Sequence, residues 1–247
     1  MPTIYKDARL KVKRAKKHIE DFSAALIALE DACTVTVEQD ENGRDLLKHE
    51  IPNSREALDD LSLIAGDVIH NLRSALDFAW PSTISRLLAD KLTDHTKFPA
   101  RKTREDVEGA LHGIEIDTRC PALWNCIMSK IQPYDGGYNC AVWTLHDLDI
   151  SDKHLLLLGL DPISQITGIS VSDQNGELHR GHSMPSTGVD GKYHILFASG
   201  IKVEDKGRLS VAVTFQEAGL YNPVPVESLL SSFGNFTLHT VQLLENI

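Results

Sequence analysis

The sequence predicts an α+β fold that is mainly helical: a helical bundle with a short inserted β-hairpin, followed by a small antiparallel β-meander and a C-terminal helix. Two observations lead to this prediction. Before residue 160, long stretches place apolar residues three and four positions apart, which is helical spacing. After residue 162, turn pairs that contain glycine separate short runs of alternating apolar residues, which is typical of antiparallel strands.

The chain of 247 residues is long enough to bury a core, and its hydrophobic content of 42% is ordinary for a globular protein. We expect residues 1–160 to form the helical bundle, with the hairpin near 33–51. Residues 161–247 should form the meander and the last helix, packed on the bundle as one unit. The formal net charge of -10 argues against non-specific DNA binding, because cations that neutralise phosphates drive that mode.

The first helix shows the clearest periodicity in the chain. Its apolar seam alternates spacings of four and three, in the order Ala8, Val12, Ala15, Ile19, Phe22, Leu26, Leu29 and Cys33. One hypothesis is that this seam continues into a homodimer. Near its start the helix also carries seven cations, for which we favour a solvated face over a phosphate-binding stripe: Lys6, Arg9, Lys11, Lys13, Arg14, Lys16 and Lys17.

The elements that follow alternate between hairpin and helices. TVTVEQ and a run ending in LLKHEI flank DENGR, whose Asn42-Gly43 suits a tight turn. A second long helix is expected from about residue 53 to 89, with Pro81 as a kink or break. Shorter helices are expected near 103–110, 118–130 and 139–150.

The C-terminal part reads as strands and then a helix. The pairs Asn175-Gly176 and Lys206-Gly207 mark turns. RLSVAVTF alternates apolar and small polar residues, so one face of this strand should be buried. After two prolines, the segment from about 226 to 246 returns to helical spacing and predicts a last helix.

A first candidate site lies on the second long helix, within GDVIHNLRSALDFAW. Its polar side gathers Asp67, His70, Asn71, Arg73, Ser74 and Asp77. Lys and Glu, the usual occupants of a solvated helix face, are absent from 57–90, so this side also contacts protein or lines a cleft. His70 and Asp77 lie two turns apart with Arg73 between them, which suits phosphate binding or acid–base chemistry. We favour the alternative, a buried hydrogen-bond network between helices.

A second candidate site lies in LHDLDISDKHLLLL, where His146, Asp147, Asp149, Asp152, Lys153 and His154 occur within nine residues. If a helix ends near Ile150, His146 and Asp149 share a face. His146, Asp149 and His154 could hold a divalent metal that activates water for hydrolysis. The alternative, which we favour, is capping and ion pairing at the end of an element.

Other features limit the functional classes. The GxSxG, GxxxxGK[ST] and GxGxxG patterns are absent, so no cofactor is expected beyond a divalent metal. Cys33, Cys120, Cys126 and Cys140 form no CxxC pair, which favours reduced thiols and a cytoplasmic location. No apolar stretch reaches the roughly 20 residues that a membrane span requires, so we expect no membrane association.

At both candidate sites the sequence resembles a family of uncharacterised bacterial and phage proteins. GDVIHNLRSALDFA is similar to the family's GDxLHNLRSALDHL, and VWTLHDLDISDKH at 142–154 is similar to WxLxELxNxDKHR. Phe98-Pro99 and the IQPY segment at 131–134 also match, so the resemblance covers roughly residues 5–160. It implies no established activity.

The chain also resembles, distantly, the HEPN domains, which are helical nucleotide-binding and RNase modules. Active HEPN domains carry an Arg followed five to seven positions later by a His. Here Phe78 stands where that His would follow Arg73. The resemblance therefore implies nucleotide or RNA binding without RNase activity.

Our leading hypothesis from the sequence is an intracellular helical module that binds an anionic ligand, such as a nucleotide or RNA phosphate. Arg73 and Lys153 would hold the anion, Asp77 would orient Arg73, and His70 would donate hydrogen bonds. The alternatives are a metal-dependent hydrolase and a non-catalytic homo-oligomeric assembly protein. The full set of candidate ligand-binding residues is His70, Asn71, Arg73, Asp77, Asp152, Lys153 and His154.

Overall fold

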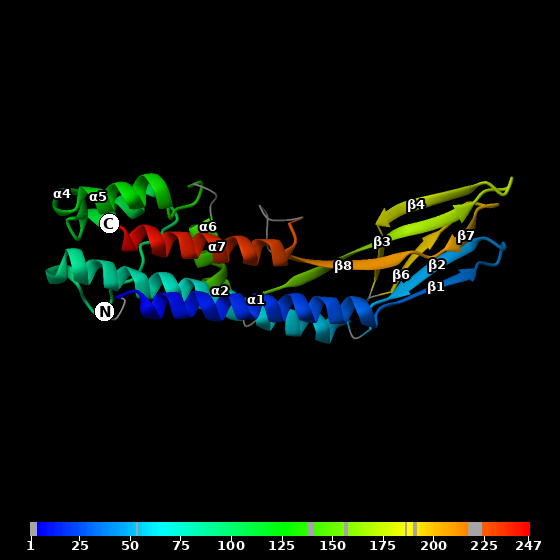
Figure 1. Ribbon diagram of the computed structural model, residues 1–247, viewed down its shortest axis with the longest axis horizontal. Coiled ribbons are helices and arrows are strands. Elements are labelled where there is room, and N and C mark those ends of the chain that lie inside the picture. The colour runs from blue at the N-terminus through cyan, green and yellow to red at the C-terminus, as the bar shows by residue number, and fades with distance from the viewer. Residues whose placement is uncertain are drawn as a thin grey trace. The chain divides into compact units, whose positions relative to one another are not determined.

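A computed structural model describes residues 4–52, 54–137, 141–155, 158–185, 187–189, 192–216 and 224–247 (Figure 1). Within these ranges the side chains of residues 153–155, 187–189 and 193 lie outside the description. The chain forms two compact units. The helical unit comprises Met1–Asp21, Leu63–Leu158 and Glu227–Ile247, and the sheet unit comprises Phe22–Ser62 and Gly159–Val226.

Helices are the regular secondary structure in the described part of the helical unit. It contains the first part of α1 (Lys6–Ala32), most of α2 (Ser54–Leu87) and α7 (Val226–Glu245), together with a group of shorter helices. These are η1 (Ala89–Lys91), α3 (Arg104–His112), α4 (Ile116–Arg119), α5 (Pro121–Asn125), η2 (Cys126–Ile131) and α6 (Ala141–Leu155). None of the helices in the described residues is long and apolar enough to cross a lipid bilayer.

One cluster of hydrogen bonds fastens the start of α1 to the ends of α2 and α7. The hydroxyl of Tyr5 lies 3.0 Å from that of Thr83 and donates to the carbonyl of Leu244 at 3.2 Å. Arg86 donates to the same carbonyl at 2.8 Å. These bonds satisfy a carbonyl in the last turn of α7, which has no partner within its own helix.

The apolar seam of α1 is used within the chain. Ala8, Val12, Ala15, Phe22, Leu26 and Leu29 are buried, whereas Ile19 and Cys33 are partly exposed. Burial of these side chains supplies much of the free energy that keeps a long helix folded. A seam that is already covered by the chain's own residues offers little apolar surface to a second copy.

α2 continues through Pro81, so the expected break does not occur. Proline in a helix interior removes one backbone hydrogen bond and favours a kink. The neighbours Ala79, Trp80 and Ile84 are all buried. Their packing compensates for the lost bond and keeps both halves of α2 in one helix.

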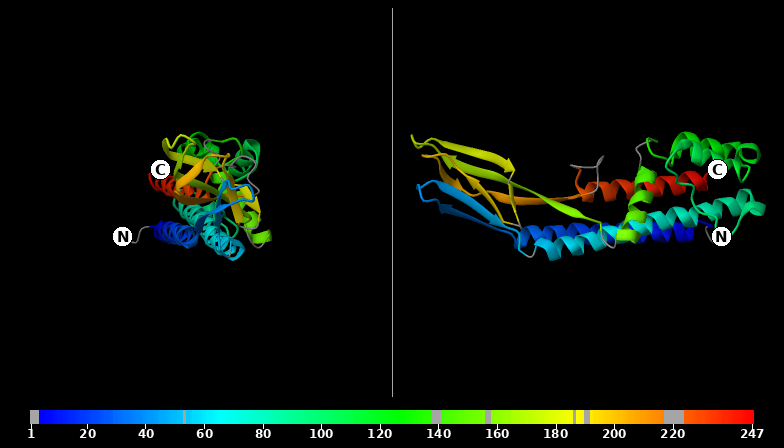
Figure 2. Two further views of the ribbon diagram at one scale, coloured as in Figure 1. Left: turned by 90° about the vertical axis from the view of Figure 1, so that its right-hand side faces the viewer. Right: turned by 180° about the vertical axis from the view of Figure 1, so that it is seen from behind.

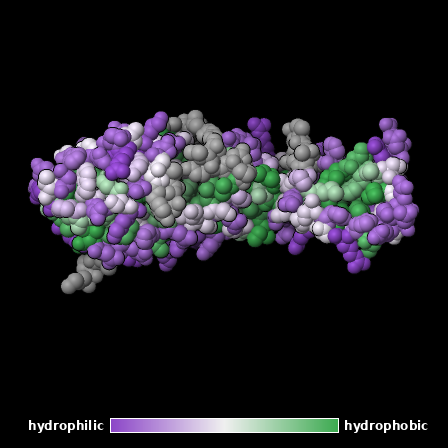
Figure 3. Space-filling view, turned by 90° about the horizontal axis from the view of Figure 1, so that it is seen from above, coloured by the Kyte–Doolittle hydropathy of each residue, from purple (hydrophilic) through white to green (hydrophobic). Residues whose placement is uncertain are grey.

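The sheet unit contains two antiparallel sheets. The first has the strand order β1 (Thr34–Gln39), β2 (Asp45–Glu50), β6 (Lys192–Leu196) and β5 (Thr187–Val189). In the second, β3 (Leu160–Ser172) pairs with β4 (Leu178–Pro185) on one side and with β7 (Lys202–Asp205) and β8 (Arg208–Phe215) on the other. On the face seen in Figure 3, hydrophobic residues gather over the strands of this unit within a hydrophilic rim.

The hairpin turn between β1 and β2 is held by a side chain. Asp40 accepts backbone N–H bonds from Asn42 and Arg44, both at 2.9 Å, and Gly43 adopts a φ of 73° that favours glycine. Hydrogen bonds from Arg44 lower the pKa of Asp40 to about 2. The Asn-Gly pair therefore forms the predicted turn.

The α+β, mainly helical fold class is confirmed, including the hairpin and the C-terminal helix. The expected domain boundaries are corrected, because the units interleave along the sequence. The hairpin joins the sheet unit through the pairing of β2 with β6, and α7 joins the helical unit. The β3 strand, and not a simple meander, organises the second sheet, since β4, β7 and β8 all pair with it.

Candidate functional site

Within the helical unit, α6 crosses α2, as the right-hand view of Figure 2 shows. Nδ1 of His70 lies 3.2 Å from Oδ1 of Asp149, and Nε of Arg73 donates to Nδ1 of His146 at 3.1 Å. His146 and Asp149 therefore share the face of α6 that contacts α2, as their spacing predicts. α6 continues to Leu155 and does not end near Ile150.

A glycine sets the distance between the two helices at the other end of this contact. A Cβ atom at position 66 would lie 2.7 Å from Oδ1 of Asp152 and 3.1 Å from its Cγ. Glycine at this position leaves room for the carboxylate of Asp152 to lie against the α2 backbone. Asp152, which was predicted as a ligand-binding residue, is thus placed against the α2 backbone.

Arg73 lies at the centre of the network formed by α2 and α6, and its side chain is only 6% exposed. Its Nη1 lies 2.9 Å from Oδ1 of Asp77 in an ion pair, without the alignment of a hydrogen bond, and its Nη2 donates to the carbonyl of Phe98 at 3.3 Å. Burial lowers the pKa of Arg73 from its usual value, while the charges of Asp77 and Asp149 oppose this effect. The guanidinium therefore faces protein groups and is not presented to a ligand in the way that the sequence hypothesis requires.

Asp77 connects α2 to the Phe98-Pro99 segment. Its Oδ1 accepts the backbone N–H of Phe98 at 3.0 Å, while Arg73 donates to the carbonyl of the same residue. Phe98 itself is fully buried, with its ring 5.7 Å from that of Trp80. These contacts hold the backbone of Phe98 against α2 and its ring against Trp80.

His70 and Ser74 form the exposed edge of the network. The side chain of His70 is 49% exposed, whereas Asp149 is 3% exposed. The hydroxyl of Ser74, one turn along α2, lies 3.5 Å from Nε2 of His70. Sequence reasoning placed Ser74 on the polar side of the helix and assigned it no role. Ser74 follows His70 by four residues, and residues at this spacing are neighbours on one face of a helix, so the sequence could have predicted this contact.

The predicted metal ligands are engaged with other protein groups where they are described. Nδ1 of His146 accepts a hydrogen bond from Arg73, so the proton of a neutral ring lies on Nε2. Asp149 contacts His70 instead. The side chains of Lys153 and His154 lie outside the described residues, so the structure gives no position for the third ligand or for the predicted cationic partner of Arg73.

Among the described residues, one group of three carries potential metal-ligating atoms within 4.8 Å of one another: Asp173, Glu177 and His179. It lies at the turn between β3 and β4. Asp173 accepts the backbone N–H groups of Asn175 and Glu177 at 2.9 and 2.8 Å. These bonds explain the position of Asp173 as part of the turn, without a metal.

Asn71 connects the α2 segment to α1. Its Oδ1 accepts a hydrogen bond from Nζ of Lys11 at 3.2 Å, and its Nδ2 donates to the carbonyl of Asp67 at 2.7 Å. Lys11 belongs to the cation-rich start of α1. Asn71 therefore lies between the α2 network and that cationic segment.

The cationic segment presents one charged face. At 100° per residue, five of its positions fall within an arc of about 100°, and all five are exposed: Lys6, Arg9, Lys13, Lys16 and Lys17. We call these five residues the cationic face of α1. Arg9 pairs with Glu245. For the other four, the described part of the chain supplies no ion-pair partner.

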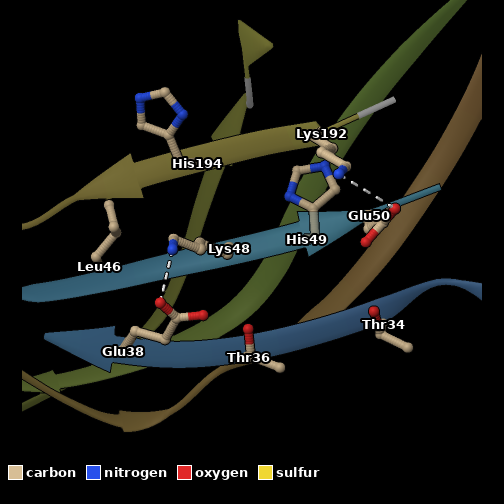
Figure 4. Close-up of a pocket in the computed structure, with 9 residues that line it drawn as sticks. All are labelled: Thr34, Thr36, Glu38, Leu46, Lys48, His49, Glu50, Lys192 and His194. Atoms are coloured by element: carbon tan, nitrogen blue, oxygen red, sulfur yellow. Dashed lines mark hydrogen bonds and ion pairs between the residues drawn. The ribbon is translucent and has the colours of Figure 1, made fainter. Parts of the chain in front are cut away.

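The sheet unit contains a cavity of about 550 Å³ over the outer side of β1, β2 and β6 (Figure 4). Lys48 lies 2.6 Å from Glu38, and Lys192 lies 4.0 Å from Glu50. His194 is the cross-strand neighbour of Lys48. Because each of these lysines lies beside a carboxylate, the cavity offers little net charge to an anion.

No family model matches this chain, and neither does any curated protein or solved structure. The geometry described above is therefore the basis for the proposed function.

Proposed function

We propose that the helical unit binds an RNA strand through the cationic face of α1. One observation carries this proposal: four exposed lysines on one side of a helix have no ion-pair partner in the described residues, in a chain whose net charge is -10. The phosphates of an RNA backbone can pair with these four lysines, and the release of counterions from the RNA favours binding. This ligand class is the one that the HEPN-like resemblance implies, and the binding surface moves from Arg73 to α1.

The length of the face favours a strand over a single nucleotide. From Lys6 to Lys17 a helix rises about 16 Å at roughly 1.5 Å per residue, so the lysines are spread over a longer distance than one phosphate can span. Consecutive phosphates of a strand can each meet one cation. Charges farther away than about 10 Å are largely screened at 0.1 M salt, so the distant part of the acidic surface opposes binding only weakly.

The cysteines fit an RNA-binding protein of the cytoplasm. Cys33, Cys120 and Cys126 carry free thiols. Such thiols persist in the reducing cytoplasm, where we place this activity. Homodimerisation through the α1 seam does not form part of the proposal, because most of the seam is buried within the chain.

The test is fluorescence anisotropy with an end-labelled 12-nucleotide oligouridine, titrated at several salt concentrations. We expect Lys13→Gln/Lys17→Gln to weaken binding about tenfold and to reduce the slope of log K against log salt by about 1.4, since each lost phosphate contact removes about 0.7. The matched control is Lys102→Gln/Lys130→Gln, which removes two exposed cations of the same unit away from α1. Equal losses in both variants, or binding that ignores salt, would show that the α1 face is not the RNA site.

A further inference from the structure

We propose that the helical unit also carries an ester-hydrolysing site, in which Ser74 is the nucleophile, His70 is the general base and Asp149 positions His70. This inference goes beyond RNA binding and rests on different residues. The hydroxyl of Ser74 lies 3.5 Å from Nε2 of His70, and Nδ1 of the same ring lies 3.2 Å from Asp149. A serine at one ring nitrogen and a carboxylate at the other is the arrangement of a Ser-His-Asp triad.

The distances suit an enzyme without substrate. Catalytic hydrogen bonds are often long in the free enzyme and shorten when substrate binds, so 3.5 Å between hydroxyl and imidazole is compatible with proton transfer. The different exposures of Asp149 and His70 also suit their proposed roles. Asp149 is 3% exposed and Arg73 lies close enough to attract its charge, whereas the side chain of His70 is 49% exposed and open to a substrate.

Ser74 differs from other hydroxyls of α2 in the partner that it contacts. Ser82 and Thr83 both bond back to the carbonyl four residues earlier, to Phe78 and Ala79 respectively, at 2.9 Å. This back-bonding is the usual state of a hydroxyl in a helix. The hydroxyl of Ser74 lies instead beside an imidazole nitrogen that can take its proton.

The reaction balances with these groups and water. The oxygen of Ser74 attacks the ester carbonyl carbon while its proton passes to Nε2 of His70. The bond from that carbon to the leaving oxygen breaks, and His70 returns the proton to the departing alcohol. His70 then takes a proton from water, which attacks the acyl-serine, and the acid leaves as Ser74 regains its proton.

The helix limits the substrate class. Backbone N–H groups around Ser74 are bonded within α2, so they cannot form the oxyanion hole that amide hydrolysis needs. Esters with good leaving groups need less of this stabilisation. Phe78, one turn beyond Ser74 and 47% exposed, offers an apolar surface to an aryl group. We therefore assign the site to activated aryl esters.

The primary test uses p-nitrophenyl acetate hydrolysis and labelling by a fluorophosphonate, which reacts with an activated serine and releases fluoride. We expect wild-type protein to gain one adduct by intact-mass measurement. Ser74→Ala should lose the adduct and at least tenfold of the hydrolysis rate, while Ser82→Ala should keep both. An unlabelled wild type, an adduct that persists in Ser74→Ala, or hydrolysis abolished by a chelator would overturn the proposal.

The other residues have separate readouts. His70→Gln should abolish labelling while the circular dichroism spectrum stays unchanged, because this side chain is half-exposed. Asp149→Asn should lower kcat per active site, with the sites counted by end-point fluorophosphonate labelling, which loss of folded protein alone would not do, and Phe78→Ala should raise KM alone. Ser74→Ala should bind oligouridine as the wild type does, so failure of the hydrolase proposal and failure of RNA binding can be told apart.

Discussion

Each unit of the molecule contains a histidine beside a serine hydroxyl, and the two pairs differ in their surroundings. In the sheet unit, Nε2 of His49 lies 3.3 Å from the hydroxyl of Ser164. In the helical unit, the corresponding distance from His70 to Ser74 is 3.5 Å. By distance alone, the pair in the sheet unit would be the better candidate for proton transfer.

Exposure separates the two pairs. His49 and Ser164 are each 3% exposed, and burial lowers the pKa of His49, which favours the neutral form of this ring. His70 has an open side, and its second nitrogen lies beside a buried carboxylate. A histidine-serine contact therefore becomes a candidate site only where its environment supplies both access and an orienting charge.

Of the changes that test this comparison, Arg73→Met should have the largest effect, a loss of stability of the helical unit. The change removes a buried cation and leaves Asp77 and Asp149 without its charge, which should cost about 3–5 kcal/mol of unfolding free energy. Urea denaturation followed by circular dichroism measures it. Arg101→Met, at an exposed position, should change stability by less than about 0.5 kcal/mol. Similar small changes in both variants would show that Arg73 does not hold the network together.

A smaller effect is expected from Gly66→Ala, which tests how closely α6 approaches α2. The new methyl group would lie within 3.1 Å of the carboxylate of Asp152. Displacing this carboxylate should cost roughly 1–3 kcal/mol of unfolding free energy, whereas the higher helix propensity of alanine should restore about 1 kcal/mol. Gly109→Ala is the matched control, since a Cβ there meets nothing within 4 Å and should stabilise α3 by about 0.5–1 kcal/mol. Thermal unfolding of both variants gives the difference. Equal stabilisation would mean that α6 can shift without cost.

Sequence patterns predicted most elements because their signals are local. Helical spacing located α1 and α2, and the Asn42-Gly43 pair located the hairpin turn. The pairing of β2 with β6 joins residues such as Leu47 and Ile195, which lie far apart in the chain. No local pattern specifies such a partner, so the expected domain boundaries were wrong where strands and helices from distant segments meet.

The candidate site was predicted only in part for the same reason. The pairing of Arg73 with Asp77 follows from their spacing on one helix, whereas the contact of His70 with Asp149 depends on the register between α2 and α6. Phe98 contributes its backbone N–H and carbonyl, which every residue other than proline possesses. Side-chain patterns cannot reveal contacts of that kind.

The smallest expected effect is on the pH dependence of the unfolding free energy, to which His49 contributes. Because burial holds the folded pKa of His49 below its usual value of 6.5, the unfolded chain binds the proton more readily between these two values. The contribution of His49 is therefore complete above about pH 6.5 and is lost as the pH falls through the folded pKa. Urea unfolding of wild type and His49→Gln from pH 7.5 to 5 should show a shallower loss in the variant. Parallel curves would mean that burial does not keep this ring neutral, and exposure would no longer explain why the two histidine-serine pairs differ.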